Sequence, residues 1–125
     1  MELLSKQKKV LVLDKDNHIL SVVDEMMQYG DWNISTTYDP YSVFDNAKVY
    51  RPDIIILDYL LLDKDCELIC QDFKADSELQ NVPIIIVTAY KTKKASADYF
   101  KCDALFIKPL DMQVLASRMD YLMAS

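Results

Sequence analysis

The alternation of apolar and polar stretches along the chain predicts a sheet covered by helices. Four short runs rich in Ile, Val and Leu are continuous rather than alternating, at residues 10–13, 54–57, 84–87 and 105–107. Continuous apolar runs of this length are typical of strands buried on both faces, as in a parallel sheet with helices on each side. A weaker fifth strand is predicted at residues 33–37.

The segments between these runs carry the spacing and end signals of helices. A first helix is predicted at residues 17–29, followed by Gly30, because a glycine suits the left-handed position after a helix. Asp39 and Pro40 predict a second helix, with the aspartate as N-cap and the proline as first helical residue. The apolar positions of the first helix are Ile19, Leu20, Val23, Met26 and Met27.

Three further helices are predicted towards the C-terminus. Residues 65–75 carry Leu68, Ile69 and Phe73 on one side, and residues 91–100 form a shorter helix. Asp111 is expected to cap the last helix. The apolar residues of the last helix include Val114, Leu115, Met119 and Leu122. Strand and helix therefore alternate five times, which predicts an α/β domain with a parallel sheet and right-handed crossovers.

Composition and charge narrow the classes of function. The 125 residues carry a formal net charge of −6, which disfavours binding to nucleic acid because that affinity rests on cationic neutralisation of phosphates. No apolar run is long enough to span a membrane, and the polar, lysine-rich N-terminus has no signal-peptide core, so we expect a cytoplasmic protein. The odd set Cys66, Cys70 and Cys102 favours reduced thiols, and the single histidine, His18, argues against histidine-based catalysis and zinc binding.

The residues that follow the predicted strands suggest the chemistry. In open α/β sheets, ligands bind at the carboxyl ends of the strands. A carboxylate there can act as a nucleophile towards phosphorus, neighbouring acids can hold Mg²⁺, and a hydroxyl and an ammonium can bind phosphoryl oxygens. The residues at these ends are Asp14, Lys15 and Asp16 after the first strand, Asp58 after the third, Thr88 after the fourth and Lys108 after the fifth.

Four stretches of the chain resemble response-regulator receiver domains of two-component systems, of the chemotaxis-regulator kind. They are VLVLDKD at residues 10–16, PDIIILD at 52–58, VPIIIVTA at 82–89 and CDALFIKP at 102–109. Each stretch alone is a weak signal, but all four occur in order and cover nearly the whole chain. The resemblance implies a flavodoxin-like, doubly wound fold of three layers, for which we predict the strand order 2-1-3-4-5 with two helices on one face and three on the other.

The resemblance also implies roles for the residues at the strand ends. Asp58 would be the phospho-acceptor, Thr88 the switch hydroxyl and Lys108 the phosphate-binding lysine, with a cis bond between Lys108 and Pro109. The metal would be Mg²⁺. Its ligands would be Asp14, Asp16, Asp58 and the backbone carbonyl of Leu60.

The same resemblance implies how such a domain works. One receiver domain would cover residues 1–125, with no output domain in this chain. It would accept the phosphoryl group from a histidine kinase or phosphotransfer protein and signal to a downstream protein by contact, with a homodimer allowed. It would not be an enzyme beyond its own phosphoryl transfer and dephosphorylation.

The chain departs from the family pattern at two informative positions. Lys15 stands where the family has a second metal-ligating acid, and at about 4 Å each unit-charge interaction is worth on the order of 4 kcal/mol before solvation offsets it. Three arrangements are open: Asp16 substitutes as ligand, Lys15 pairs with Asp58 in place of the cation, or Lys15 points to solvent. Leu105 replaces the switch aromatic, and the neighbouring Phe106 is expected to face the other side of the strand.

Two functions of different classes follow. The first is a phosphorylatable receiver. The second is a degenerate receiver that acts as a phosphorylation-independent interaction module because of Lys15. A flavin-binding electron carrier of similar topology is disfavoured, because the acidic segment 14–17 contains no glycine to cradle a phosphate.

Overall fold

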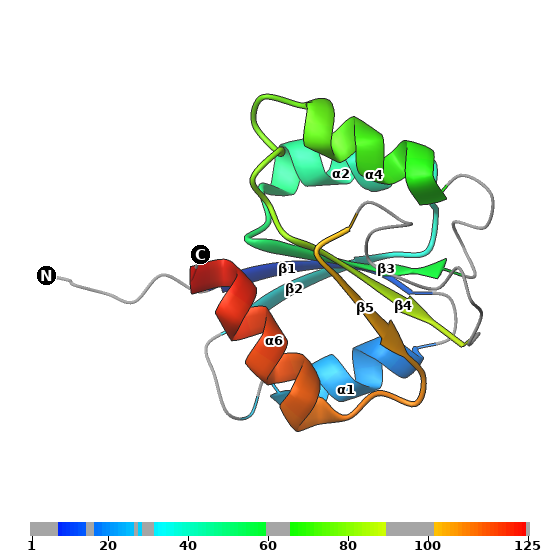
Figure 1. The fold of residues 1–125 in the computed structure, drawn as a ribbon, viewed down its shortest axis with the longest axis vertical. Coiled ribbons are helices and arrows are strands. Elements are labelled where there is room, and N and C mark those ends of the chain that lie inside the picture. The colour runs from blue at the N-terminus through cyan, green and yellow to red at the C-terminus, as the bar shows by residue number, and fades with distance from the viewer. Residues whose placement is uncertain are drawn as a thin grey trace, which may run out of the picture.

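The computed structural model describes residues 8–14, 17–26, 28, 32–59, 66–89 and 102–124. Its centre is a five-stranded sheet in the order β2-β1-β3-β4-β5, and every neighbouring pair is parallel, as predicted (Figure 1). The strands are β1 (Lys8–Leu13), β2 (Trp32–Thr37), β3 (Ile54–Asp58), β4 (Ile84–Thr88) and β5 (Ala104–Ile107).

Helices cover both faces of this sheet (Figure 1). The helices α1 (His18–Met26) and α6 (Met112–Ala124) lie on one face, and α2 (Val43–Tyr50) and α4 (Cys66–Ala75) lie on the other. The helix predicted at residues 91–100 lies outside the described residues, as do Met27, Gly30 and Asp65. The predicted arrangement of two and three helices is therefore observed as two and two in the part that the structure describes. None of these described helices is long and apolar enough to cross a membrane.

The central strands β1, β3 and β4 are largely buried because their side chains enter two separate apolar clusters, whereas the edge strand β2 is only partly buried. All five residues of β3 and of β4 are buried, as the continuous apolar runs predict. The cluster under α2 and α4 includes Leu11, Leu13, Ile55, Leu57, Cys70 and Phe73. The cluster under α1 and α6 includes Val10, Val12, Ile54, Ile56, Leu115 and Met119. This alternation fixes the register of the strands, since a slip by one residue would exchange the two sets.

One predicted helix start is wrong. The helix α2 begins at Val43, four residues after Asp39, and Ser42 stands at the N-cap position. Asp39 instead closes a turn: its Oδ1 accepts a hydrogen bond from the Tyr41 amide at 3.0 Å, and its carbonyl oxygen accepts one from the Ser42 amide at 3.2 Å. Aspartate favours such local turns as well as helix caps. The Asp39-Pro40 pair therefore lies just before a helix, as predicted, but the N-cap is Ser42 and not Asp39.

Two of the apolar residues named for the predicted helices are exposed. Leu68 on α4 is 59% exposed and Val114 on α6 is 55% exposed. The core face of α4 runs through Cys70 and Phe73, which leaves Leu68 on the solvent side. On α6 the predicted Leu115 is buried, and Asp111 caps the helix as predicted, because its Oδ1 accepts a hydrogen bond from the Val114 amide at 3.0 Å.

Candidate functional site

Four of the predicted site residues meet at the carboxyl edge of the sheet. The strand register pairs Leu13 with Leu57, so Asp14 and Asp58 stand at the ends of the neighbouring strands β1 and β3. On the other side of Asp58, Thr88 ends β4, and the Lys108 amide just after β5 donates a hydrogen bond to the Thr88 carbonyl at 2.8 Å. Parallel strands thus bring together residues that are far apart in sequence.

These polar side chains are buried, which is costly without compensating partners. Asp58 is 0% exposed, Thr88 2% and Asp14 7%. They are the buried polar or charged residues of the described part, and all three lie at this one edge. Buried polar groups that cluster at a sheet edge are characteristic of a functional site rather than of a core.

Lys108 supplies a positive charge to Asp58. Its Nζ lies 3.4 Å from Asp58 Oδ2, and its side chain is 10% exposed. The Lys108–Pro109 peptide bond is cis, as the family resemblance implies. The pair is thus largely withdrawn from water. Charge interactions between buried groups are less screened than those at the surface.

Asp14 is held through both its main chain and its side chain. The Asp14 amide donates to the carbonyl oxygen of Thr37 at 3.0 Å, which extends the ladder between β1 and β2. The Asp14 Oδ2 accepts a hydrogen bond from the Leu20 amide, in the first turn of α1, at 2.8 Å. The carboxylate therefore lies between the end of a strand and the start of a helix.

The remaining predicted ligands lie outside the described residues. They are Lys15, Asp16 and Leu60, so the three arrangements proposed for Lys15 stay predictions. Within the described ranges, no group of three His, Cys, Asp or Glu side chains is placed to hold a metal ion. Asp14 and Asp58 nevertheless supply two buried carboxylates on neighbouring strands, and carboxylate oxygens are the ligands that Mg²⁺ prefers. These two residues fit part of a magnesium site.

The strand β5 separates the two residues at the predicted switch position. Leu105 packs against the cluster under α2 and α4, whereas Phe106 packs against the cluster under α1 and α6. The prediction that Phe106 faces the other side of the strand is confirmed. Phe106 therefore does not place its ring on the side of Leu105, where the resemblance implies a switch aromatic.

Two of the cysteines belong to the apolar packing on one face of the sheet. Cys70 and Cys102 form no disulfide bond and pack under α2 and α4. Burial raises the pKa of the Cys102 thiol to about 12, so this side chain is a poor nucleophile at neutral pH.

Comparison with known proteins identifies the family. A family model for the response regulator receiver domain matches residues 10–120, most of the chain. The chain belongs to this family. The family's general role is to receive a phosphorylation signal in two-component systems, which agrees with the acidic edge of the sheet.

Similar receiver domains occur in proteins of different lengths. The chain is 26% identical over 113 residues to the response regulator ArlR of Staphylococcus saprophyticus, an alignment covering 88% of this chain and 50% of ArlR. It is 23% identical over 107 residues to the polar-differentiation response regulator DivK of Brucella anthropi, covering 84% of this chain and 87% of DivK. The chain thus spans half of one relative and most of the other.

A solved structure confirms the fold of the receiver domain. The receiver domain of the sensor histidine kinase PA1611 from Pseudomonas aeruginosa superposes with a TM-score of 0.79 at 18% identity, covering 96% of this chain and 100% of that one. That structure has a magnesium ion coordinated in its active-site cleft.

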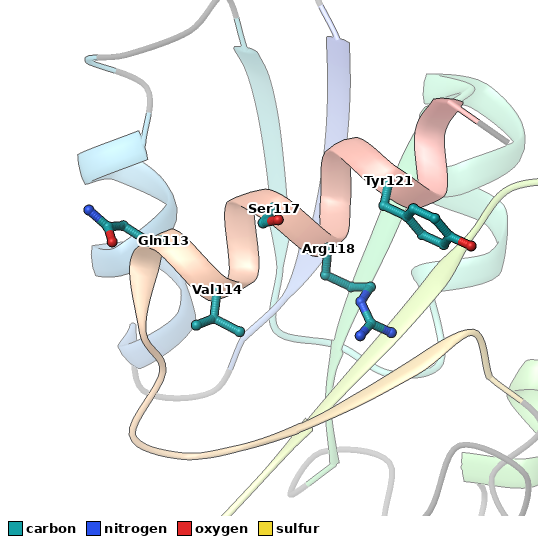
Figure 2. A pocket seen from close by; sticks show the side chains of 5 residues that line it. All are labelled: Gln113, Val114, Ser117, Arg118 and Tyr121. Carbon is teal, nitrogen blue, oxygen red and sulfur yellow. The ribbon is translucent and has the colours of Figure 1, made fainter.

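The receiver domain also has a surface pocket that sequence reasoning missed. It lies along the outer side of α6 and is lined by Gln113, Val114, Ser117, Arg118 and Tyr121. Figure 2 shows Val114, Arg118 and Tyr121 projecting from the same side of the helix. Val114 is one of the apolar residues of the predicted last helix, and its apolar character alone did not mark it as part of a surface pocket. Gln113, Ser117 and Tyr121 are four residues apart in turn, as are Val114 and Arg118, and side chains at this spacing are neighbours on a helix surface.

Proposed function

We propose that this receiver domain accepts a phosphoryl group on Asp58 and signals by contact with another protein. The observation that carries the proposal is the position of Asp58: it is fully buried at the end of a central strand, 3.4 Å from the Lys108 ammonium. A carboxylate held in this way can attack phosphorus from the open edge of the sheet.

The transfer step follows from this geometry. A carboxylate oxygen of Asp58 forms a bond to the phosphorus of a phosphohistidine, the bond from phosphorus to the imidazole nitrogen breaks, and that nitrogen keeps the electron pair. When the other imidazole nitrogen of the phosphohistidine is protonated, the products are an aspartyl phosphate on this chain and a neutral histidine on the donor. Such a transfer depends mainly on positioning and charge stabilisation rather than on further covalent chemistry.

Two side chains next to Asp58 are suited to hold the transferred group. The Lys108 ammonium already faces Asp58 and would pair with a phosphoryl oxygen as negative charge develops there. The hydroxyl of Thr88, at the end of the adjacent strand, would donate a hydrogen bond to another phosphoryl oxygen. Neither residue needs to change its protonation state for this role.

Asp14 and Asp58 would hold Mg²⁺, together with Asp16 and the Leu60 carbonyl outside the described residues. When bound, the ion would neutralise charge on the phosphoryl oxygens. The magnesium ion in the PA1611 receiver supports this assignment as a property of the same fold. The residues of this chain contribute the two buried carboxylates and the fixed orientation of Asp14.

We infer that the partners are a donor histidine kinase or phosphotransfer protein and a downstream protein, with all reactions in the cytoplasm. The domain would turn over no separate substrate, because its chemistry ends with its own aspartyl phosphate. The pocket on α6 offers apolar area beside the Arg118 guanidinium, a combination common in protein interfaces. This surface would contact the downstream protein or a second copy of the chain.

A degenerate receiver is the second candidate, favoured by one specific residue. Lys15 adds a positive charge directly after Asp14, where the family has a metal ligand. If the Lys15 ammonium takes the place of the ion, the domain would bind its partner without phosphorylation.

Labelling with acetyl phosphate distinguishes the two candidates. With Mg²⁺ present, the wild type should gain the mass of one phosphoryl group, whereas Asp58→Asn should gain none. Asp53→Asn is the matched control, because Asp53 precedes the same strand at the opposite edge and accepts a hydrogen bond from the Lys9 amide. Absence of labelling in the wild type, or equal labelling of wild type and Asp58→Asn, would reject phosphorylation on Asp58.

A further inference from the structure

Asn17 has a backbone conformation that few residues adopt. Its φ is 66°, and Arg51, with a φ of 56°, is the other residue of the described part with a positive φ; neither is glycine. The left-handed region is unfavourable for residues with a Cβ, although asparagine tolerates it better than most. Asn17 lies between the site residue Asp14 and the helix α1, so its conformation decides how the helix leaves the site.

The hydrogen bonds around Asn17 define the start of α1. The Asn17 carbonyl accepts a hydrogen bond from the Ser21 amide at 2.9 Å, which makes Asn17 the N-cap of the helix that begins at His18. Leu20 is then the third helical residue, and its amide has no acceptor within the helix. An N-cap side chain usually accepts from this amide.

In α1 this hydrogen bond goes to a residue outside the helix instead. The Leu20 amide donates to Asp14 Oδ2 at 2.8 Å. The helix α6 shows the usual arrangement, because its own N-cap Asp111 accepts from the equivalent amide, that of Val114, at 3.0 Å. The first turn of α1 therefore binds the Asp14 carboxylate of the functional site. A hydrogen bond from an amide to a carboxylate is charge-assisted.

We propose that Asn17 is a positioning residue for Asp14. Its left-handed backbone turns the first turn of α1 towards Asp14, so that the Leu20 amide holds the carboxylate in the orientation needed for Mg²⁺. The main chain of Asp14 is fixed by its hydrogen bond to Thr37, and the Leu20 amide acts on the side chain. The inference rests on the proposed function, because it assigns the purpose of the bond to the metal site.

The test uses two substitutions at Asn17 and the same two at Arg51. Glycine adopts a positive φ without cost, whereas valine, being β-branched, is strongly disfavoured there. Arg51 is the matched control, because it is also left-handed but lies at the C-cap of α2, before the amino end of β3. Both Arg51→Val and Arg51→Gly lose the ion pair between Arg51 and Glu78. The difference between these two variants therefore does not include the effect of that loss.

Three measurements on each full-length variant separate position from stability. They are the hydrogen exchange rate of the Leu20 amide without metal, the affinity for Mg²⁺ followed by Trp32 and tyrosine fluorescence, and the rate of labelling by acetyl phosphate across Mg²⁺ concentrations. Asn17→Gly should stay close to the wild type in all three. Asn17→Val should lose protection at Leu20 and bind Mg²⁺ at least about tenfold more weakly, which corresponds to roughly 1.4 kcal/mol.

The labelling rate of Asn17→Val should recover at saturating Mg²⁺, because the defect is in the orientation of a metal ligand. Arg51→Val should lower the midpoint of urea unfolding and leave Mg²⁺ affinity and labelling unchanged. Protection of Leu20 and wild-type Mg²⁺ affinity in Asn17→Val would overturn the inference. So would equal losses of Mg²⁺ affinity in Asn17→Val and Arg51→Val, or in Asn17→Val and Asn17→Gly.

The proposed function and the positioning role of Asn17 can be rejected separately. A wild type that neither binds Mg²⁺ nor is labelled would reject the proposed function together with the purpose assigned to this bond. The exchange of the Leu20 amide would still report whether Asn17 orients Asp14. A wild type that is labelled, with an Asn17→Val variant that matches it, would reject the positioning role alone.

Discussion

The ion pair between Lys108 and Asp58 should stabilise the domain in the absence of metal. At the observed separation of 3.4 Å and an effective dielectric near 20, the attraction is about 5 kcal/mol before desolvation is counted. Asp58 is fully buried and the Lys108 side chain is 10% exposed, so solvent screening is weak. Removing one partner of a buried pair costs about 3–5 kcal/mol, because the other charge stays in the protein. We therefore expect Lys108→Met to lower the free energy of unfolding by about 3 kcal/mol.

A double-mutant cycle with Asp58→Asn isolates the interaction itself. In the Asp58→Asn background, Lys108→Met should cost less than about 1 kcal/mol, which leaves a coupling energy of about 2 kcal/mol. Urea unfolding in a chelating buffer, followed by Trp32 fluorescence, measures each corner. With an m value of about 2 kcal/mol per molar urea, the single variant should shift the midpoint by about 1.5 M. A coupling energy within about 0.5 kcal/mol of zero would refute the claim that these two charges interact in the folded protein.

Three further predictions concern the metal site, an ion-pair cluster and the core. Lys15→Asp should tighten Mg²⁺ binding at least about tenfold in a fluorescence titration, because it removes a competing cation; an unchanged affinity would show that Lys15 points away from the site. Hydrogen bonds from Lys48 lower the pKa of Asp76 below its ordinary value of 3.8, so the stability they provide is present above that pH and is lost as the pH falls through the lowered value. Lys48→Met should therefore destabilise the domain at neutral pH and weaken its loss of stability below about pH 3.8; parallel curves for both proteins would contradict this cause. Phe73→Ala, in the core under α4, should cost about 3–5 kcal/mol, whereas Leu68→Ala on the exposed side of the same helix should stay within about 0.5 kcal/mol, and equal costs would mean that the face of α4 is misassigned.

Four strands could be predicted from continuous apolar runs, and the central strands β3 and β4 are buried throughout. The edge strand β2, with the sequence WNISTT, is only partly buried and carries the weaker signal. Each predicted strand falls within two residues of an observed one. Their parallel order then placed Asp14, Asp58, Thr88 and Lys108 at one edge. The central residues of the site thus followed from topology and side-chain chemistry together.

Other features depend on tertiary contacts that periodicity does not encode. Leu68 and Val114 are apolar residues on solvent faces, and hydrophobicity alone does not tell them from core residues. Asp39 is suited both to a turn and to a helix cap, and in the structure its carboxylate accepts a hydrogen bond within a turn. The hydrogen bond between the Leu20 amide and Asp14 depends on the left-handed backbone of Asn17. Hydrophobic periodicity does not predict this backbone conformation.

The measurement that bears most directly on the central claim is the location of the phosphoryl group. Wild-type protein would be treated with acetyl phosphate and Mg²⁺ and then reduced with borohydride, which converts an aspartyl phosphate to homoserine. Peptide mass mapping would then identify the converted residue. We expect conversion at Asp58 and at no other acidic residue of the chain. Conversion at another aspartate, or none in a protein that has gained the mass of a phosphoryl group, would contradict it.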